Sequence, residues 1–491
     1  MKSQDLLDAI GLAKDEYIQD AKRPIQKKQL FRSKGFYSGI AALLAFSILL
    51  GSILLPQSPW FVGGWFSEEE PLVSSEEDLL ARYRIGTPQY PEMVQYPQDP
   101  NASYEEIMAW RNCIYELKSD YKAESINLDH FLEQSIPVFR SGKEGENTIY
   151  SPINVYMALA MLAETTGGNS RAQILELLDV AGVNQLRREA SAIWKANYLN
   201  DGVNTCLLAN SLWLRDNWAF QQETVSILSQ KYYASVFRGE MGSDDYNVAL
   251  RDWMNEQTGG LLKDQIDDIE MDPSTVLALV STVWFEAAWE TKFYNAGDRV
   301  FHSSTQDVEV PFIEQGIMGA VYSEGERFSA LEIPFKTNQA SIAFILPEEG
   351  TTAESLLSDP QLLSFVINRN EWDNKESVYA DLSLPKFDVS SQIDLKEGLK
   401  ELGITDVFDP AISNFSPITT ESNEIYVDKA THGARVQLDE NGCIATAYTI
   451  ITDGNGSAPK HIEFVVDRPF LFVIYSPSGL PLFIGIVNQP Q

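Results

Sequence analysis

The order of hydrophobic patterns along this 491-residue chain predicts a mixed α+β fold whose sheet is rich in antiparallel strands. Apolar residues recur near helical spacing from Ile126 to Phe139, from Met157 to Ala163 and from Gln173 to Leu178. Later segments have the composition of strands: Leu277–Phe285, Ala340–Leu346 and Val378–Leu384. Because the helices come first, the strands follow and no linker separates them, we expect one large domain over residues 105–491.

The composition is that of a globular protein, with 44% apolar and 22% charged residues. The 37 basic and 70 acidic residues give a net charge of −33, which argues against nucleic-acid binding because that function needs a basic surface. The acidity lies beyond residue 35, since residues 1–35 hold eight Lys and Arg against five Asp and Glu.

The sequence gives little support for an enzyme. It contains no GxSxG, HExxH or phosphate-binding loop, and its four histidines are far apart. A pair of Cys443 and His432 on one continuous strand would be eleven residues apart and would point to opposite faces. The three cysteines, which also include Cys113 and Cys206, make no metal-spaced cluster. We therefore expect no catalytic residue, no metal and no cofactor.

Residues 36–55 contain no charge and are long enough, at ~1.5 Å per residue, to span a hydrocarbon core of ~30 Å. A basic segment precedes them, and Trp60 and Trp65 follow at interfacial positions. We expect a single-pass anchor, with residues 1–35 in the cytoplasm and the C-terminal domain outside the cell. The alternative is a cleaved signal peptide, which the long polar head and the lack of an A-x-A site disfavour.

Residues 56–104 are predicted to form an extracellular stalk. They hold an acidic run from Glu68 to Glu70 and a series of prolines from Pro88 to Pro100. Low apolar content and regular prolines favour an extended, poorly packed linker.

The last seventy residues contain a strand-like segment followed by a soft loop. Cys443–Thr452 has no Pro, Gly or charge and is rich in Ile, Thr and Tyr, so it should join a sheet readily. Asp453–Pro459 is flexible and cleavable, and hydrophobic strands lie beyond it at Phe464–Tyr475 and Leu482–Pro490. A strand-forming segment next to a loop that a protease can cleave is the arrangement of an inhibitor that captures its protease.

Eight short motifs in order make the chain resemble a serpin over about residues 125–491. They are Asn147–Asn154 with Ala158–Met161, Trp253–Gly260, Ser281–Trp289, Leu331–Phe335, Leu384–Phe387, Leu395–Ile404, Asp467–Phe472 and Phe483–Pro490. The resemblance implies helices around three antiparallel-rich β-sheets and an exposed reactive centre loop. It also implies a suicide inhibitor: the target serine protease cleaves the loop, forms an acyl-enzyme and is trapped when the loop inserts into the central sheet.

The resemblance also assigns roles to residues of this chain. The hinge that starts insertion consists of Glu440, Gly442, Cys443, Ala445, Ala447 and Thr449. Alternate residues from Cys443 onward should face inward, and all four are small, so a closely packed interior can admit them. A polar cluster that holds the sheet closed is assigned to Ser151, Asn154, Ser281 and His432, and the breach above it to Trp289.

This chain departs from the family pattern at several of these positions. The family usually has Thr or Ser in place of Cys443 and a small residue in place of Tyr448. Asn154 and Ser281 exchange the Ser and Asn that the family often has, a swap that keeps two hydrogen-bonding side chains. A non-inhibitory serpin fold, acting as a binding module or a plain protease substrate, is therefore the alternative.

Family spacing places the cleaved bond within Gly454–Ala458. Counting forward from Gly442 puts it at Gly456-Ser457, which we favour, and counting back from Pro469 puts it after Ala458. A cut at Ile451 or Thr452 is the alternative. Fourteen or so residues of strand from the hinge reach ~46 Å, enough to carry a protease along the domain. Small residues at the bond predict an elastase-like or subtilisin-like target, because a trypsin-like pocket would gain little from them.

The remaining expectations concern setting and partners. We expect a monomer whose partner is its target protease, in a covalent acyl complex, with the N-terminal helix in the membrane. A stalked serpin with basic residues inside the cell suggests a bacterial cell-surface protein.

Overall fold

The computed structural model describes residues 79–97, 99, 102–122, 128–139, 145–267, 269–421, 425–443 and 459–490. The chain divides into two units, Met1–Ser74 and Ser75–Gln491, and all described residues belong to the second. The predicted cytoplasmic segment and the predicted anchor lie outside the described residues. Within the described part of the chain, no helix has the length and apolar character of a membrane span.

The central sheet is a mixed sheet with six described strands. Its order is β1-β5-β4-β6-β14, with β3 paired to β4. The β4–β5 ladder is parallel, and β6 is antiparallel to both β4 and β14. The bounds are β1 Arg84–Gly86, β3 Leu199–Asn200, β4 Thr205–Arg215, β5 Ala234–Gly239, β6 Leu277–Ala288 and β14 Gly442–Cys443.

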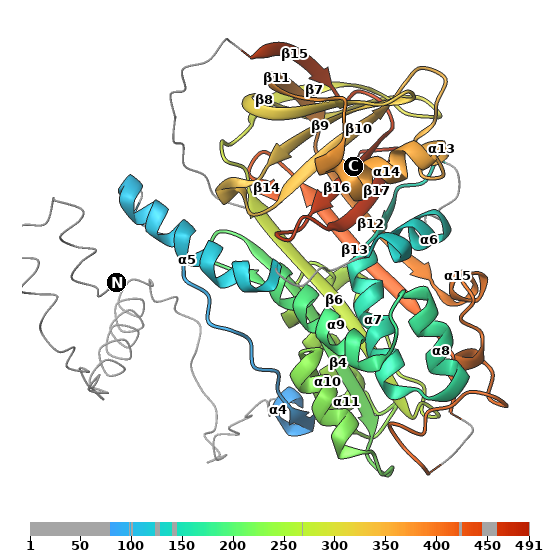
Figure 1. Ribbon diagram of the computed structural model, residues 1–491. Coiled ribbons are helices and arrows are strands. Elements are labelled where there is room, and N and C mark those ends of the chain that lie inside the picture. Colours follow the sequence, from blue (N-terminus) through green and yellow to red (C-terminus); the bar gives the residue numbers. More distant parts are fainter. Residues whose placement is uncertain are drawn as a thin grey trace, which may run out of the picture. The chain divides into compact units, whose positions relative to one another are not determined.

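A separate antiparallel pair, β12 (Phe387–Asp394) and β13 (Thr431–Leu438), lies beside this sheet (Figure 1). No ladder joins β6 to β13 among the residues that the structure describes. We call this interruption the sheet break.

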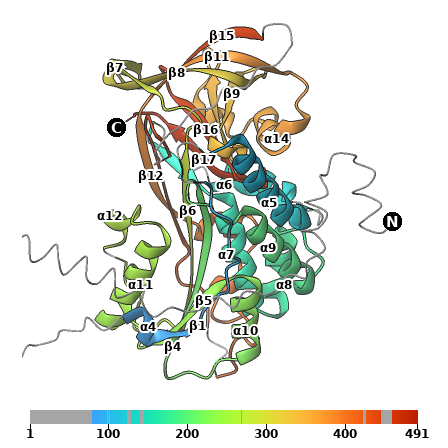
Figure 2. The ribbon, with the colours of Figure 1, turned by 90° about the vertical axis from the view of Figure 1, so that its left-hand side faces the viewer.

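Helices cover both faces of the central sheet (Figure 2). On one side lie α7 (Pro152–Thr165), α8 (Gly168–Leu177) and α9 (Val183–Asn197), and on the other α11 (Asp244–Gln257) and α12 (Lys263–Ile266). Every residue of α7 except Ala158 is buried, as expected for a helix that is apolar on all sides. The other helices are α4 Leu79–Tyr83, α5 Tyr104–Lys122, α6 Asp129–Phe139, α10 Gln222–Lys231, α13 Ala353–Leu356, α14 Pro360–Asn368 and α15 Lys396–Glu401.

A second large sheet has the order β15-β11-β8-β9-β10-β16-β17-β2, with β7 paired to β8. Its C-terminal strands β16 and β17 are buried along their whole length, which agrees with their continuous hydrophobic sequence. The bounds are β2 Thr148–Tyr150, β7 Tyr294–His302, β8 Asp307–Glu324, β9 Phe328–Pro334, β10 Ser341–Pro347, β11 Lys375–Pro385, β15 Lys460–Val465, β16 Phe470–Tyr475 and β17 Pro481–Val487.

The predicted fold class is confirmed. The three strand segments expected from composition are β6, β10 and β11, and the segment from Met157 lies inside α7. Apart from β4–β5 and β11–β15, the ladders are antiparallel. The described chain thus has helices around several mainly antiparallel sheets.

The expected stalk needs a correction, because its C-terminal part packs on the domain. β1 pairs with β5 and forms the edge of the central sheet, and the Tyr90 ring lies 4.9 Å from the Trp194 ring. The Tyr96 N–H donates to the Asp201 carbonyl at 2.7 Å. The prolines in this segment did not prevent the Tyr90 ring from docking on α9 or the Tyr96 backbone from bonding to the turn after β3.

Candidate functional site

The two faces of β6 contact different hydrophobic cores. Phe285 and Ala287 are buried in the main core, and Val283 packs against it from the same face. Ala278 and Val280, which alternate with them, pack against the smaller core formed with α11. Because strand side chains alternate between faces, the odd-numbered residues of β6 face the main core. A strand added at the sheet break would acquire the same two faces.

Polar groups from four elements, α7, β4, β6 and β13, meet beneath the sheet break. Near the start of α7, the Asn154 side-chain amide donates to the backbone carbonyl of Ser281 on β6 at 3.3 Å. The Ser281 hydroxyl in turn donates to Asn210 Oδ1 on β4 at 2.8 Å. On the β13 side, the backbone N–H of Ser151 donates to His432 Nε2 at 3.1 Å. The start of α7 therefore bonds to both strands that border the sheet break.

The structure thus brings together the four residues that the sequence analysis assigned to the polar cluster. They form two hydrogen-bonded pairs, Ser151 with His432 and Asn154 with Ser281. The Ser151 hydroxyl itself has no partner among the described atoms. Asn210, which was not predicted, completes the cluster: its side-chain amide donates to the Tyr232 carbonyl at 2.8 Å. No local signal marks Asn210, since it lies within a hydrophobic strand.

His432 is held neutral in this cluster. Burial lowers the pKa of His432 to about 4, because a charged imidazolium would lose its hydration there. Its ring meets the Tyr150 ring edge-on at 5.7 Å, and its Nε2 accepts the Ser151 N–H. Protonation would remove that acceptor and bury a charge, so the contact between α7 and β13 depends on a neutral histidine.

Trp289 joins the end of β6 to the turn that precedes β14. Its indole N–H donates to the Asp439 carbonyl at 2.9 Å, and its backbone N–H donates to the Asn441 carbonyl at 3.1 Å. Its ring stacks on Phe335 with centroids 4.9 Å apart. The residue that the sequence analysis placed at the breach is therefore fixed on both its polar and its apolar side.

Glu440 is tied to Lys386, the residue that connects β11 to β12. Its carboxylate lies 2.5 Å from the Lys386 ammonium, and this hydrogen bond lowers the pKa of Glu440. Its carbonyl accepts the Phe293 N–H at 2.9 Å. Lys386 belongs to the motif Leu384–Phe387 in the sequence, but nothing local indicated that it would pair with Glu440.

Gly442 lies very close to the backbone of β6. Its φ is +139°, a conformation that residues with a side chain rarely adopt. A Cβ at this position would lie 2.3 Å from the Ala287 carbonyl oxygen and 2.9 Å from Ala288 Cα. Only glycine lets the chain begin β14 against β6, where Gly442 pairs with Ala288 and Cys443 with Ala287.

The other loop residues named from the sequence lie outside the described residues. These are Ala445, Ala447 and Thr449 of the hinge and the whole range Gly454–Ala458, with the favoured bond Gly456-Ser457. The structure describes their two ends, at Cys443 in β14 and at Lys460 in β15. At the second end, Lys460 is paired with Glu376, and His461 Nε2 lies 2.8 Å from Asp381 Oδ2 on β11.

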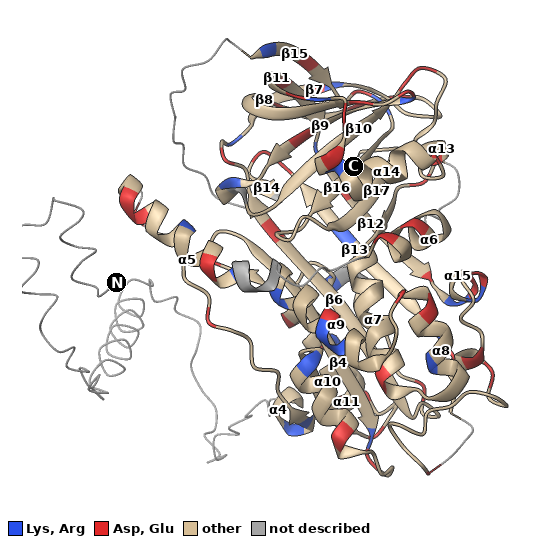
Figure 3. Ribbon diagram, in the orientation of Figure 1, with Lys and Arg blue, Asp and Glu red and all other residues tan. Residues whose placement is uncertain are grey.

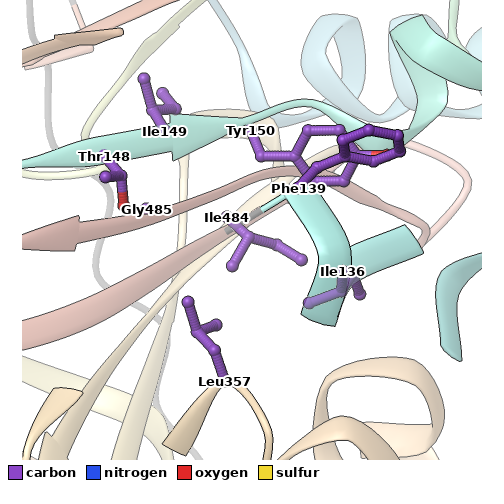
Figure 4. A pocket seen from close by; sticks show the side chains of 8 residues that line it. All are labelled: Ile136, Phe139, Thr148, Ile149, Tyr150, Leu357, Ile484 and Gly485. Atoms are coloured by element: carbon purple, nitrogen blue, oxygen red, sulfur yellow. The ribbon is translucent and has the colours of Figure 1, made fainter. Parts of the chain in front are cut away.

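A cavity between α6, β2 and β17 does not suit a ligand (Figure 4). Its volume of about 10 Å³ is at the lower limit for one water molecule. Phe139, Ile149, Tyr150 and Ile484 are among its mainly apolar lining residues.

In the described part of the chain, no group of three or more His, Cys, Asp or Glu side chains could hold a metal ion. Acidic residues are distributed over both ends of the domain (Figure 3).

Comparisons with known proteins agree with this geometry. The family model described as serpin (serine protease inhibitor) matches residues 135–490. Plasminogen activator inhibitor 1 of Sus scrofa is 28% identical over 384 residues, which cover 72% of this chain and 90% of that protein. Neuroserpin of Mus musculus is 27% identical over 377 residues, covering 72% and 88%. The crystal structure of the thermophilic serpin tengpin in its native state superimposes with a TM-score of 0.64 at 24% identity, covering 84% of this chain and 98% of tengpin.

Proposed function

Because the chain belongs to the serpin family, we propose that it inhibits a serine protease by presenting its reactive loop for cleavage and inserting the cut loop at the sheet break. The family is one of serine protease inhibitors, and the chain matches its model over residues 135–490. The proposal extends this general assignment to a mechanism and a target class.

The register of β14 on β6 is the observation that carries the proposal. Gly442 pairs with Ala288 and Cys443 with Ala287, so each later loop residue would pair one position earlier on β6. Continued insertion would set Ala445 opposite Phe285, Ala447 opposite Val283 and Thr449 opposite Ser281. Directly opposed residues of an antiparallel pair share a face, and these β6 residues face the main core or the polar cluster.

The sizes of the loop residues suit those positions. Alanine side chains would enter the packed side of the sheet, where bulky groups would meet α7. Thr449 would arrive beside Ser281 and Asn154, where a hydroxyl can hydrogen-bond. On the opposite face, Ile444 would lie next to Glu286, a half-buried carboxyl whose pKa is raised by desolvation.

The same register supports the predicted cleavage range. Asp453 would pair with Leu277, the first residue of β6, so a bond after Gly456 would lie three residues beyond the end of that strand. A protease acylated there would be carried the length of β6, ~40 Å at ~3.3 Å per residue. The small residues at Gly454–Ala458 favour an elastase-like or subtilisin-like enzyme with a shallow pocket.

One observation favours the alternative of a plain substrate. Tyr448 would pair with Thr282, which is buried, so a large ring would need room on the face toward α11. Slow insertion at that point would let the acyl-enzyme hydrolyse before the protease is distorted. The ratio of trapped protease to hydrolysed acyl-enzyme would therefore depend on how fast Tyr448 pairs with Thr282 during insertion.

We also propose that the inhibitor is tethered to a membrane with its serpin domain outside the cell. The support comes from the uncharged segment 36–55, its basic N-terminal flank and Trp60 and Trp65 after it. The bacterial origin suggested by this topology remains a prediction. Protease added to intact cells should remove the serpin domain and leave a membrane-bound N-terminal fragment, whereas a cleaved signal peptide would leave none.

The trapping proposal is tested by mixing the domain with pancreatic elastase and with subtilisin on a denaturing gel. A band at the summed mass is expected, and cleavage with full protease activity retained would contradict the proposal. Ala447→Arg should convert the inhibitor into a substrate, because insertion would bury an unpaired charge opposite Val283.

The matched control is Ile444→Arg. It introduces the same side chain three residues away, but on the face where Glu286 can receive it, so trapping should persist. Equal trapping by both variants would show that the assigned inward face is wrong.

A further inference from the structure

The described chain begins at one pole of the central sheet, with α4 and β1, which precede the family match. The Arg82 guanidinium of α4 lies 3.4 Å from the Asp245 carboxylate of α11, and the Tyr83 ring meets the Tyr246 ring edge-on at 4.9 Å. β1 follows directly and pairs Arg84 with Phe237 of β5. Figures 1 and 2 both show α4 at the end of the domain opposite β15.

Hydrogen-bonded ladders place β1 at the same height as the start of β6. Phe237 pairs with Trp213 on β4, and Trp213 pairs with Ala278 on β6. The β14 register would bring Thr452 opposite Ala278 after insertion. The inserted loop would therefore end level with β1, and Gly456 would project beyond the sheet at the pole occupied by α4.

Simple dimensions decide whether a trapped protease would reach α4. Four strand spacings separate β1 from the inserted strand, a lateral distance of ~19 Å at ~4.8 Å each. A protease of roughly 220 residues has a radius of gyration of about 17 Å and hence a radius of about 22 Å. Since its active site would be anchored only a few residues past the sheet, its body would extend over α4 and β1.

We propose that α4 and β1 form a contact surface for the trapped protease, so that the captured enzyme lies at the pole where the chain enters the folded unit. This inference rests on the proposed trapping mechanism. It gives α4 and β1, which precede the family match, a role in the final complex. The surface is available, because Ile85 is 53% exposed.

Photo-crosslinking tests this contact. A benzophenone amino acid replaces Ile85 in the full chain, and a second variant carries it in place of Arg82. The matched control carries it in place of Met318, which is 68% exposed and pairs with Tyr379 beside β15, at the loop-bearing pole. Each variant is irradiated with active elastase, and separately with elastase whose nucleophilic serine has been replaced.

We expect the Ile85 and Arg82 variants to crosslink to active protease within the covalent complex and not to the inactivated enzyme. The Met318 variant should show the reverse preference, because it lies near the loop before cleavage. A covalent complex that gives no crosslink from Ile85 or Arg82 would overturn this inference and leave trapping intact. Equal crosslinking with the inactivated enzyme would also overturn it. Absence of any covalent complex would instead refute the proposed function, and the inference with it.

Discussion

Replacing Gly442 with alanine should separate β14 from β6. The added Cβ would lie 2.3 Å from the Ala287 carbonyl oxygen, 2.9 Å from Ala288 Cα and 3.0 Å from the Trp289 nitrogen. All three are backbone atoms within β6 or directly after it, so a side-chain rotation cannot relieve the overlap. A φ of +139° is in addition unfavourable for alanine.

The expected cost follows from these contacts. Adopting the observed φ with a Cβ costs about 1–3 kcal/mol, and moving β14 away instead loses the Gly442–Ala288 and Cys443–Ala287 pairing at about 1 kcal/mol for each hydrogen bond. Either route costs about 2 kcal/mol, which shifts the attachment of β14 roughly 30-fold toward the detached state. Since β14 sets the register for insertion, the acyl-enzyme should hydrolyse more often before it is trapped.

The assay is a titration of elastase with inhibitor, which gives the number of inhibitor molecules consumed per protease inactivated. We expect this number to rise several-fold in Gly442→Ala, with more cleaved inhibitor on a denaturing gel. Gly433→Ala is the control, because Gly433 lies on β13 with no atom within 4 Å of the added Cβ. If Gly442→Ala traps protease as efficiently as the unmodified chain, the β14 contact does not guide insertion and the register argument is wrong.

Two further predictions concern stability. Because burial lowers the pKa of His432 to about 4 from 6.5, the unfolded chain takes up a proton that the native state excludes, so stability should fall between about pH 6.5 and pH 4 by about 3 kcal/mol. Denaturant melts of His432→Asn should show a smaller loss over that range, and an unchanged pH profile would contradict the assignment. Tyr90→Ala should cost about 2 kcal/mol in the same melts, because the ring packs on Trp194, whereas Tyr115→Ala, at a 67% exposed position, should stay within about 0.5 kcal/mol. Equal effects would mean that the segment before α5 is not docked as described.

Secondary structure was predictable where one local pattern governed it. β6 and β10 are continuous hydrophobic segments, and α7 is apolar on all sides, so composition alone indicated their type and burial. The segment 84–96 was not predictable in this way. Its prolines indicated a linker, but its attachment depends on Phe237 of β5, which pairs with Arg84, and on Trp194 of α9, which contacts Tyr90; each partner is more than a hundred residues away.

The sequence by itself indicated the mixed α+β class, the helical segments from Ile126, Met157 and Gln173, and the strands β6, β10 and β11, because each has a recognisable local pattern. The hinge glycine and four residues of the polar cluster were assigned from the family resemblance, and Asn210 carried no local signal. Only the tertiary structure decided that β6 and β13 remain unpaired, that the start of α7 bonds to both, and that Lys386 neutralises Glu440. These features join residues that are far apart in the chain. Their formation depends on the closing of long loops around a common core, and no local pattern records which distant partner satisfies a given hydrogen bond.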